Sequence, residues 1–235
     1  MVLGKNKGHT YEDKIFEILE SSGLLFPGTV KEGMAGGVDA VFCHLGKPYN
    51  LEVKNGLSAD YGQKKFNWSK KEGWTWSEND DTTRLYSLLK VLQRVRNKNI
   101  VPRRYSKEKT RITYKDAEID QKAFEDRTCI VKAESLWKYY GEKDAHYIQV
   151  GSGYGFYHLD RDVAKLGTEQ FNSDFILRFR AKYHDRVDRQ GGTLVPTPWN
   201  YSFFAVLKVK SKPKPKRSKY NLEESDDQEF PPIAP

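Results

Sequence analysis

The stretch GGVDAVFCHLGKPYNLEVKNG, residues 36–56, determines the expected fold of this chain. Residues 38–43 and residues 49–54 are two short runs rich in apolar, β-branched and aromatic side chains. The segment between them, residues 44–48, contains a glycine and a proline, which are typical of turns. The pattern predicts an antiparallel β-hairpin.

Three charged residues stand at the two ends of this hairpin. Asp39 is near the start of the first strand, and Glu52 and Lys54 are near the end of the second. These ends meet in an antiparallel hairpin, and residues two apart share one face of a strand, so we expect two carboxylates and one ammonium group to converge. A hard cation such as Mg²⁺ prefers oxygen ligands, which here are the two carboxylates and the backbone carbonyl of Val53. Glu12, from the preceding segment, is a candidate for a further ligand.

This arrangement resembles the PD-(D/E)xK nuclease superfamily, whose fold is that of the restriction endonucleases. Its pattern is an Asp, a variable gap and (Asp/Glu)-x-Lys, and here Asp39 precedes Glu52-Val53-Lys54 by twelve intervening residues. Residues 8–12, GHTYE, look like the Gly-x-x-x-Glu opening of archaeal Holliday-junction resolvases. Gln63 is similar to the glutamine that opens the next helix in many of these nucleases. The resemblance covers about residues 8–66 and has Val38 where the signature has a proline.

The resemblance implies a Mg²⁺-dependent endonuclease, with Mn²⁺ as a substitute, that hydrolyses DNA phosphodiester bonds. Its implied catalytic residues are Asp39, Glu52, Lys54 and Glu12, and its implied ion ligands are Asp39, Glu52, Val53 and Glu12. In that chemistry the ion stabilises negative charge at the phosphate, and the lysine orients the attacking water or helps to deprotonate it. A junction resolvase is the most specific version. A site-specific restriction or homing-type endonuclease remains an alternative, and so does a non-catalytic DNA-binding protein on a degenerate nuclease fold.

The fold class expected from these patterns is α/β, with a restriction-endonuclease-like core of a mixed β-sheet flanked by helices and a β-rich C-terminal half. We expect one enlarged domain over residues 1–209 and a flexible tail over residues 210–235, in which a basic block precedes an acidic one. Thr10 is the expected N-cap of a first helix that ends at Gly23. Further helices are expected over 82–95 and 134–140, and further strands over 128–131, 146–150, 156–159, 175–179 and 202–209.

The composition excludes a membrane protein and a wholly disordered chain. The 235 residues are 13% aromatic and 31% charged, with a mean hydropathy of −0.77. No apolar run approaches the roughly 18 residues of a membrane-spanning helix. With two cysteines and no apolar segment typical of a secretory signal, the chain is expected to be cytoplasmic.

The positive charge is concentrated in one segment, residues 60–115. This segment contains 15 Lys or Arg and 6 Asp or Glu, whereas the net charge of the whole chain is +8. Such a cluster suits a phosphate backbone, so we expect DNA as the partner, branched or duplex, with RNA left open. A homodimer is expected because two strands have to be cut.

Trp68, Trp74 and Trp76 lie among lysines, and the pattern leaves open whether they line a nucleic-acid groove or pack in a core. The candidate nucleic-acid contacts are Gln63, Lys64, Lys65, Arg94, Arg96, Arg103, Arg104, Lys107, Lys109 and Arg111.

Overall fold

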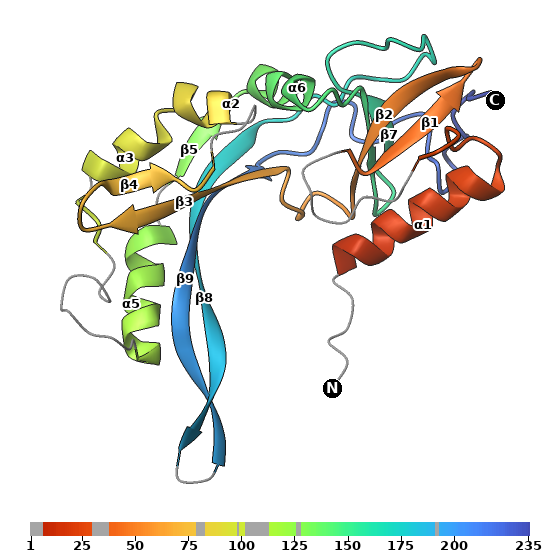
Figure 1. The fold of residues 1–235 in the computed structure, drawn as a ribbon. Helices are drawn as coiled ribbons and strands as arrows, with labels where there is room; N and C mark the ends of the chain where they lie inside the picture. Colours follow the sequence, from red (N-terminus) through yellow and green to blue (C-terminus); the bar gives the residue numbers. More distant parts are fainter. Residues whose placement is uncertain are drawn as a thin grey trace. The chain divides into compact units, whose positions relative to one another are not determined.

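The structure is a computed structural model that describes residues 7–29, 38–78, 83–97, 99–101, 113–125, 128–190 and 193–235; at 7, 128, 183–190 and 193–201 the backbone alone is described. It is mixed α/β, as predicted (Figure 1). No helix in this described part combines the length and the apolar composition needed to cross a membrane.

The chain divides into two compact units, where a single domain over residues 1–209 was expected. The first unit consists of Met1–Tyr61, Val131–Phe175 and Lys208–Pro235, and the second of Gly62–Ile130 and Ile176–Leu207. The second unit is therefore inserted, in two pieces, into the chain of the first. Each unit has a sheet and an apolar core of its own.

The first unit is built on a four-stranded sheet with the order β1-β2-β6-β7. Strands β1 and β2 are antiparallel, β2 and β6 are parallel, and β6 and β7 are antiparallel. The predicted hairpins and the helix predicted over 134–140 are confirmed. The elements are α1 (Lys7–Ser21), β1 (Ala40–His44), β2 (Lys47–Lys54), α6 (Ala133–Glu142), β6 (Tyr147–Val150) and β7 (Gly155–His158).

Local turn chemistry sets the boundaries of the first elements. The β1–β2 hairpin turns at Leu45 and Gly46, whose φ angles of 50° and 74° are those of a tight hairpin turn. Helix α1 ends as predicted at Gly23, which adopts a φ of 68°. It begins earlier than predicted, however, so that Thr10 lies inside the first turns and is not the N-cap.

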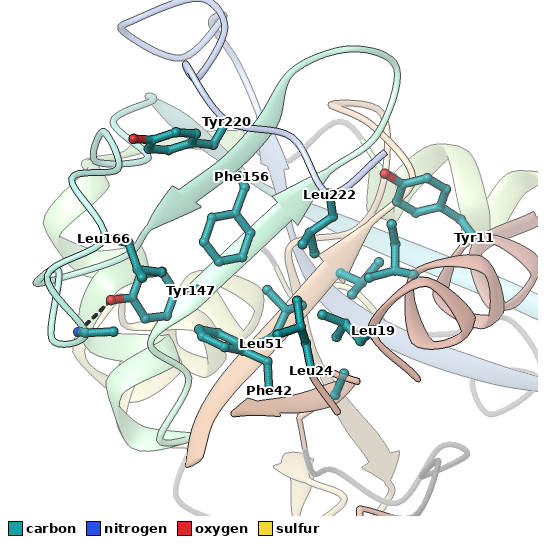
Figure 2. Packing of buried hydrophobic residues seen from close by; sticks show 14 residues of the cluster. Tyr11, Leu19, Leu24, Phe42, Leu51, Tyr147, Phe156, Leu166, Tyr220 and Leu222 are labelled. Atoms are coloured by element: carbon teal, nitrogen blue, oxygen red, sulfur yellow. Dashed lines mark hydrogen bonds between the residues drawn. The ribbon is translucent and has the colours of Figure 1, made fainter. Parts of the chain in front are cut away.

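The core of the first unit lies between α1 and one face of this sheet (Figure 2). Ile15 and Leu19 of α1 pack with Leu51 and Val53 of β2 in this cluster. Because side chains alternate along a strand, Glu52 and Lys54 point to the opposite face. The same core is completed by aromatic side chains of three strands, Phe42, Tyr147 and Phe156.

The prediction of a flexible tail over residues 210–235 is wrong. Tyr220 and Leu222 are buried in the core of the first unit (Figure 2), and the carbonyl of Tyr220 accepts the N–H of Phe156 at 2.7 Å. The basic and acidic blocks that suggested disorder pair with each other, through Arg217 with Asp227 and through Lys219 with Glu229. Composition indicated disorder because this segment buries a few well-spaced side chains and not a continuous apolar run.

The second unit contains a five-stranded sheet with the order β4-β3-β9-β8-β5. Its core is aromatic: Phe66 packs against Trp74, Phe124, Phe179 and Phe203. The helix expected over 82–95 is two helices, separated at Lys90, which has a φ of 54°. The elements are β3 (Gly62–Ser69), β4 (Gly73–Trp76), α2 (Thr83–Leu88), α3 (Val91–Asn97), α5 (Tyr114–Glu125), β5 (Thr128–Val131), β8 (Phe175–Gln190) and β9 (Thr193–Val209).

Candidate active site

The β1–β2 hairpin brings together Asp39 and the Glu52-Val53-Lys54 segment, as the sequence predicts. Ala40 is the register partner of Leu51, so Asp39, one residue earlier, lies opposite Glu52. The Oδ2 atom of Asp39 accepts the backbone N–H of Val53 at 2.7 Å. This hydrogen bond holds the Asp39 carboxylate against the backbone between the other two charged residues.

Glu52 is the most enclosed member of the site, with a side chain 4% exposed. Its Oε1 atom lies 2.5 Å from Nζ of Lys54, and its Oε2 atom lies 3.0 Å from Nζ of Lys143. The Lys54 ammonium is also 3.8 Å from Oδ2 of Asp39. Two carboxylates and two ammonium groups therefore form one charged cluster, defined here as Asp39, Glu52, Lys54 and Lys143.

No pattern in the sequence points to Lys143. This residue follows α6, and 91 positions separate it from Glu52. Tyr140, one turn earlier, is fully buried and donates its hydroxyl to the carbonyl of Tyr61 at 2.7 Å, which anchors the end of the helix within the first unit. A lysine near the end of a helix is a common pattern, so the sequence contains no signal for this contact.

The surroundings of Asp39 disfavour the charged form of its carboxyl group. Burial and the nearby charge of Glu52 raise the pKa of Asp39 to about 6. The Lys54 ammonium and the Val53 N–H oppose this rise in the pKa but do not cancel it. A buried carboxylate of this kind is less stable than one in water, and a cation beside it would relieve the cost.

Glu52 and Lys54 stabilise each other in their charged forms. Burial alone raises the pKa of Glu52, but the charges of Lys54 and Lys143 outweigh it and hold that pKa below its usual value. For Lys54, burial acts to lower the pKa, and the charges of Glu52 and Asp39 outweigh it and raise the pKa. Lys54 is therefore protonated at neutral pH, which disfavours the expected role in deprotonating water and leaves it a cation.

Glu12, the fourth expected catalytic residue, lies in the first turns of α1. Its Oε2 atom is 3.0 Å from Nδ1 of His9, and its negative charge contributes to the raised pKa of Asp39. Within the residues that the structure describes, no group of three or more His, Cys, Asp or Glu side chains is arranged to hold a metal ion. Glu12 is thus near enough to influence Asp39, but it does not share a ligand cluster with Asp39 and Glu52.

The oxygen atoms of the charged cluster fit one hard cation. Each carboxylate oxygen can accept about two contacts, and in the described part of the chain the contacts of Asp39 involve Oδ2 and leave Oδ1 open. Glu52 retains acceptor capacity on each oxygen beside its lysine. Together with the Val53 carbonyl, these atoms are the oxygen donors that Mg²⁺ or Mn²⁺ prefers.

The expected nucleic-acid contacts belong to the second unit, and those that the structure describes differ in their exposure. Lys65 is exposed on β3 and Arg94 and Arg96 are exposed on α3, although Arg96 also donates to the Trp74 carbonyl at 2.6 Å. Gln63 is exposed on β3, not at the start of a helix as the resemblance predicts. Lys64 is a poor candidate because it is buried. Arg103, Arg104, Lys107, Lys109 and Arg111 lie outside the described residues.

The tryptophan-rich segment is at least partly core. Trp74 is 2% exposed, packs edge-on against Phe203, and donates its ring N–H to the carbonyl of Ile100 at 2.9 Å. Trp68 and Trp76 are partly exposed on the neighbouring strand positions. Of the two interpretations left open above, core packing therefore describes Trp74.

Comparisons of the chain with protein-family models, with curated proteins and with solved structures found no match. The functional interpretation therefore depends on the geometry of the charged cluster and on the order of the elements around it.

Proposed function

We propose that this chain is a metal-dependent endonuclease that hydrolyses DNA phosphodiester bonds with Mg²⁺, for which Mn²⁺ can substitute. The observation that carries the proposal is the convergence of Asp39, Glu52 and Lys54 at one end of a hairpin. A buried glutamate and a partly buried aspartate beside a lysine are not required for folding alone, since enclosed ion pairs rarely add net stability.

The order of elements in the first unit supports a restriction-endonuclease-like core. Helix α1 is followed by a short bridge in which Leu25 pairs with Phe42 of β1. The β1–β2 hairpin comes next, and α6 then leads to β6, which is parallel to β2. Helix, antiparallel strands, helix and parallel strand is the order that this proposal requires, with the second unit inserted between β2 and α6.

Three residues of the charged cluster have a role in the proposed reaction. Asp39 and Glu52, together with the Val53 carbonyl, would hold the cation, which when bound supplies Lewis-acid stabilisation of the negative charge that develops on the phosphate. Water attacks phosphorus in line with the leaving oxygen, whose bond to phosphorus breaks; the attacking water loses a proton to solvent and the leaving oxygen gains one from solvent. Lys54 remains protonated, orients the phosphate and offsets its charge. Among the exposed cations of the second unit, we assign Lys65, Arg94 and Arg96 to the DNA backbone.

Junction resolution is the most specific form of this function. It is favoured by residues 8–12, which lie in the first turns of α1 and include Glu12. A site-specific nuclease is favoured by the second unit, because a compact insertion with its own sheet exceeds what a minimal resolvase needs. In either case we propose that two copies of the chain act together, one for each strand.

The test is cleavage of supercoiled plasmid, linear duplex and four-way junctions by wild type and Asp39→Asn, with and without Mg²⁺ or Mn²⁺. We expect metal-dependent cleavage that falls by at least about a thousandfold in the variant, an effect typical of losing a group that stabilises the transition state. Asp226→Asn, at an exposed aspartate, is the matched control and should cleave like wild type. Cleavage that survives in Asp39→Asn, or its absence in wild type with every DNA form, would contradict the proposal.

A further inference from the structure

Glu52 is bound by two ammonium groups from separate elements. Lys54, on its own strand, contacts Oε1 at 2.5 Å, and Lys143, after α6, contacts Oε2 at 3.0 Å. The side chains of Lys54 and Lys143 are 13% and 14% exposed, so both ammonium groups are largely withdrawn from solvent. The nuclease motif accounts for Lys54 but not for Lys143.

The two oxygens of Glu52 have different surroundings. Oε1 faces the Lys54 ammonium, which also lies 3.8 Å from Asp39, so this oxygen is on the side of the second carboxylate. Oε2 faces Lys143. Phosphodiesterases that use two cations hold them roughly 3.5–4 Å apart. A second cation at this site would therefore have to bind Oε2, where Lys143 already lies.

We propose that Lys143 takes the place of a second cation, so that the site binds one divalent ion and not two. This inference rests on the proposed function, because it concerns the stoichiometry of the ion in that same site.

The charges of the cluster support a single ion. Two carboxylates and two ammonium groups leave the metal-free cluster without net charge. One divalent ion gives the enclosed site two positive charges. A phosphodiester neutralises one of them, and the further negative charge that develops on it during attack neutralises the other. A second ion would double that excess and would lie within a few ångströms of the Lys143 ammonium, where the effective dielectric constant is low and repulsion is strong. Lys143 supplies positive charge at that position without this excess.

The experiment counts the Mn²⁺ ions bound to the full chain, by calorimetric titration and by electron paramagnetic resonance of the bound ion. Ions of this site are defined as those lost in Asp39→Asn. We expect one such ion in wild type and in Lys143→Arg, and two in Lys143→Ala, with the spectral broadening of a pair of nearby Mn²⁺ ions. Lys138→Ala, at an exposed lysine of α6, is the matched control and should bind one.

Two outcomes overturn the inference: two ions in wild type, or one ion in a folded Lys143→Ala variant. If Lys143→Ala does not fold, Lys143→Met retains the aliphatic stem and takes its place, and the wild-type count, taken against Asp39→Asn, remains decisive without any variant of Lys143. Failure of the proposed function gives a different result. Wild type would then bind no more Mn²⁺ than Asp39→Asn, which overturns both the nuclease site and its stoichiometry.

Discussion

Two buried polar clusters lie on opposite faces of the same pair of strands, β2 and β6. The charged cluster surrounds Glu52 and Lys54 on one face. The other, which we call the neutral cluster, consists of Tyr11, Gln149, Asn221 and Gln228. Gln149 is the register partner of Val53, the residue between Glu52 and Lys54, so the two clusters are separated by the thickness of the sheet.

The neutral cluster is satisfied by fixed hydrogen bonds. Gln149, which is fully buried, donates to Asn221 at 2.8 Å and to the Tyr11 hydroxyl at 3.2 Å, and it accepts the N–H of Leu222 at 3.2 Å. Gln228 donates to the carbonyls of Ser218 and Tyr154. These groups hold the C-terminal segment against α1 and β6. Buried polar groups of this kind stabilise a unique packing because each has its partner.

The charged cluster differs in that its two carboxylates are unequally paired with ammonium groups. Oδ2 of Asp39 lies 3.8 Å from the nearest ammonium, that of Lys54, and the pKa of Asp39 stays raised, whereas each oxygen of Glu52 contacts a lysine. Burial of polar groups alone therefore does not distinguish the two clusters. What distinguishes them is the incompletely compensated charge of Asp39 in an enclosed position, a property typical of functional sites.

The largest expected effect comes from removing residues 217–235, which contribute two members of the neutral cluster. The deletion exposes the core covered by Tyr220 and Leu222 and removes the hydrogen bonds of the Gln149 side chain to Asn221 and Leu222, so we expect the first unit to lose at least about 5 kcal/mol of stability. Thermal unfolding followed by circular dichroism and limited proteolysis measure this. An unchanged melting temperature would mean that the segment does not pack as described.

The next largest effect is expected for Gln149→Leu. The substitution leaves the backbone N–H of Leu222 without its acceptor in the interior and removes one hydrogen bond each from Tyr11 and Asn221, which should cost about 3 kcal/mol in the free energy of unfolding. Cleavage per folded molecule should remain as in wild type, because the neutral cluster faces away from the charged one. The matched control is Gln63→Leu, at an exposed strand position, which should change stability little. Equal effects of the two substitutions would contradict the comparison.

Asp39→Asn should act in the opposite direction and stabilise the protein. The folded-state pKa of Asp39, about 6, lies above its ordinary value of 3.8, so its contribution to stability is present below pH 4 and is lost as the pH rises through 6. Asparagine is neutral throughout, so the gain should be small at pH 4 and reach about 3 kcal/mol at pH 7.5. Chemical denaturation in a chelating buffer measures it, and a gain independent of pH would contradict the assignment.

The smallest effect is expected for Lys14→Ala, at the solvent-exposed margin of the neutral cluster. Lys14 contacts Glu223 at 2.6 Å, but its side chain is 56% exposed, so the loss should be about 0.5 kcal/mol or less. Lys138→Ala, on α6, controls for the change in helix propensity. A larger loss for Lys14 would show that this ion pair belongs to the cluster and does not merely border it.

Much of the candidate site follows from patterns within the hairpin. Turn residues and apolar runs predicted that the hairpin ends carrying Asp39 and Glu52 meet, and alternation put Glu52 and Lys54 on one face, as the structure has them. The register that sets Asp39 opposite Glu52 did not follow from the sequence. Patterns failed where a residue's environment depends on distant partners. Lys64 belongs to a basic segment yet is buried, and Gln63 occupies a strand where the family resemblance suggested a helix.

Local patterns were sufficient to predict the hairpin, the α/β class and the convergence of Asp39 with Glu52-Val53-Lys54. These features depend on backbone geometry and on contacts between residues within fifteen positions of each other. The contact of Lys143 with Glu52, across 91 positions, and the burial of the C-terminal segment against Gln149, across 72, emerge only from the tertiary fold. Such contacts form when distant segments share one core, and a local pattern contains no information on which segments will meet.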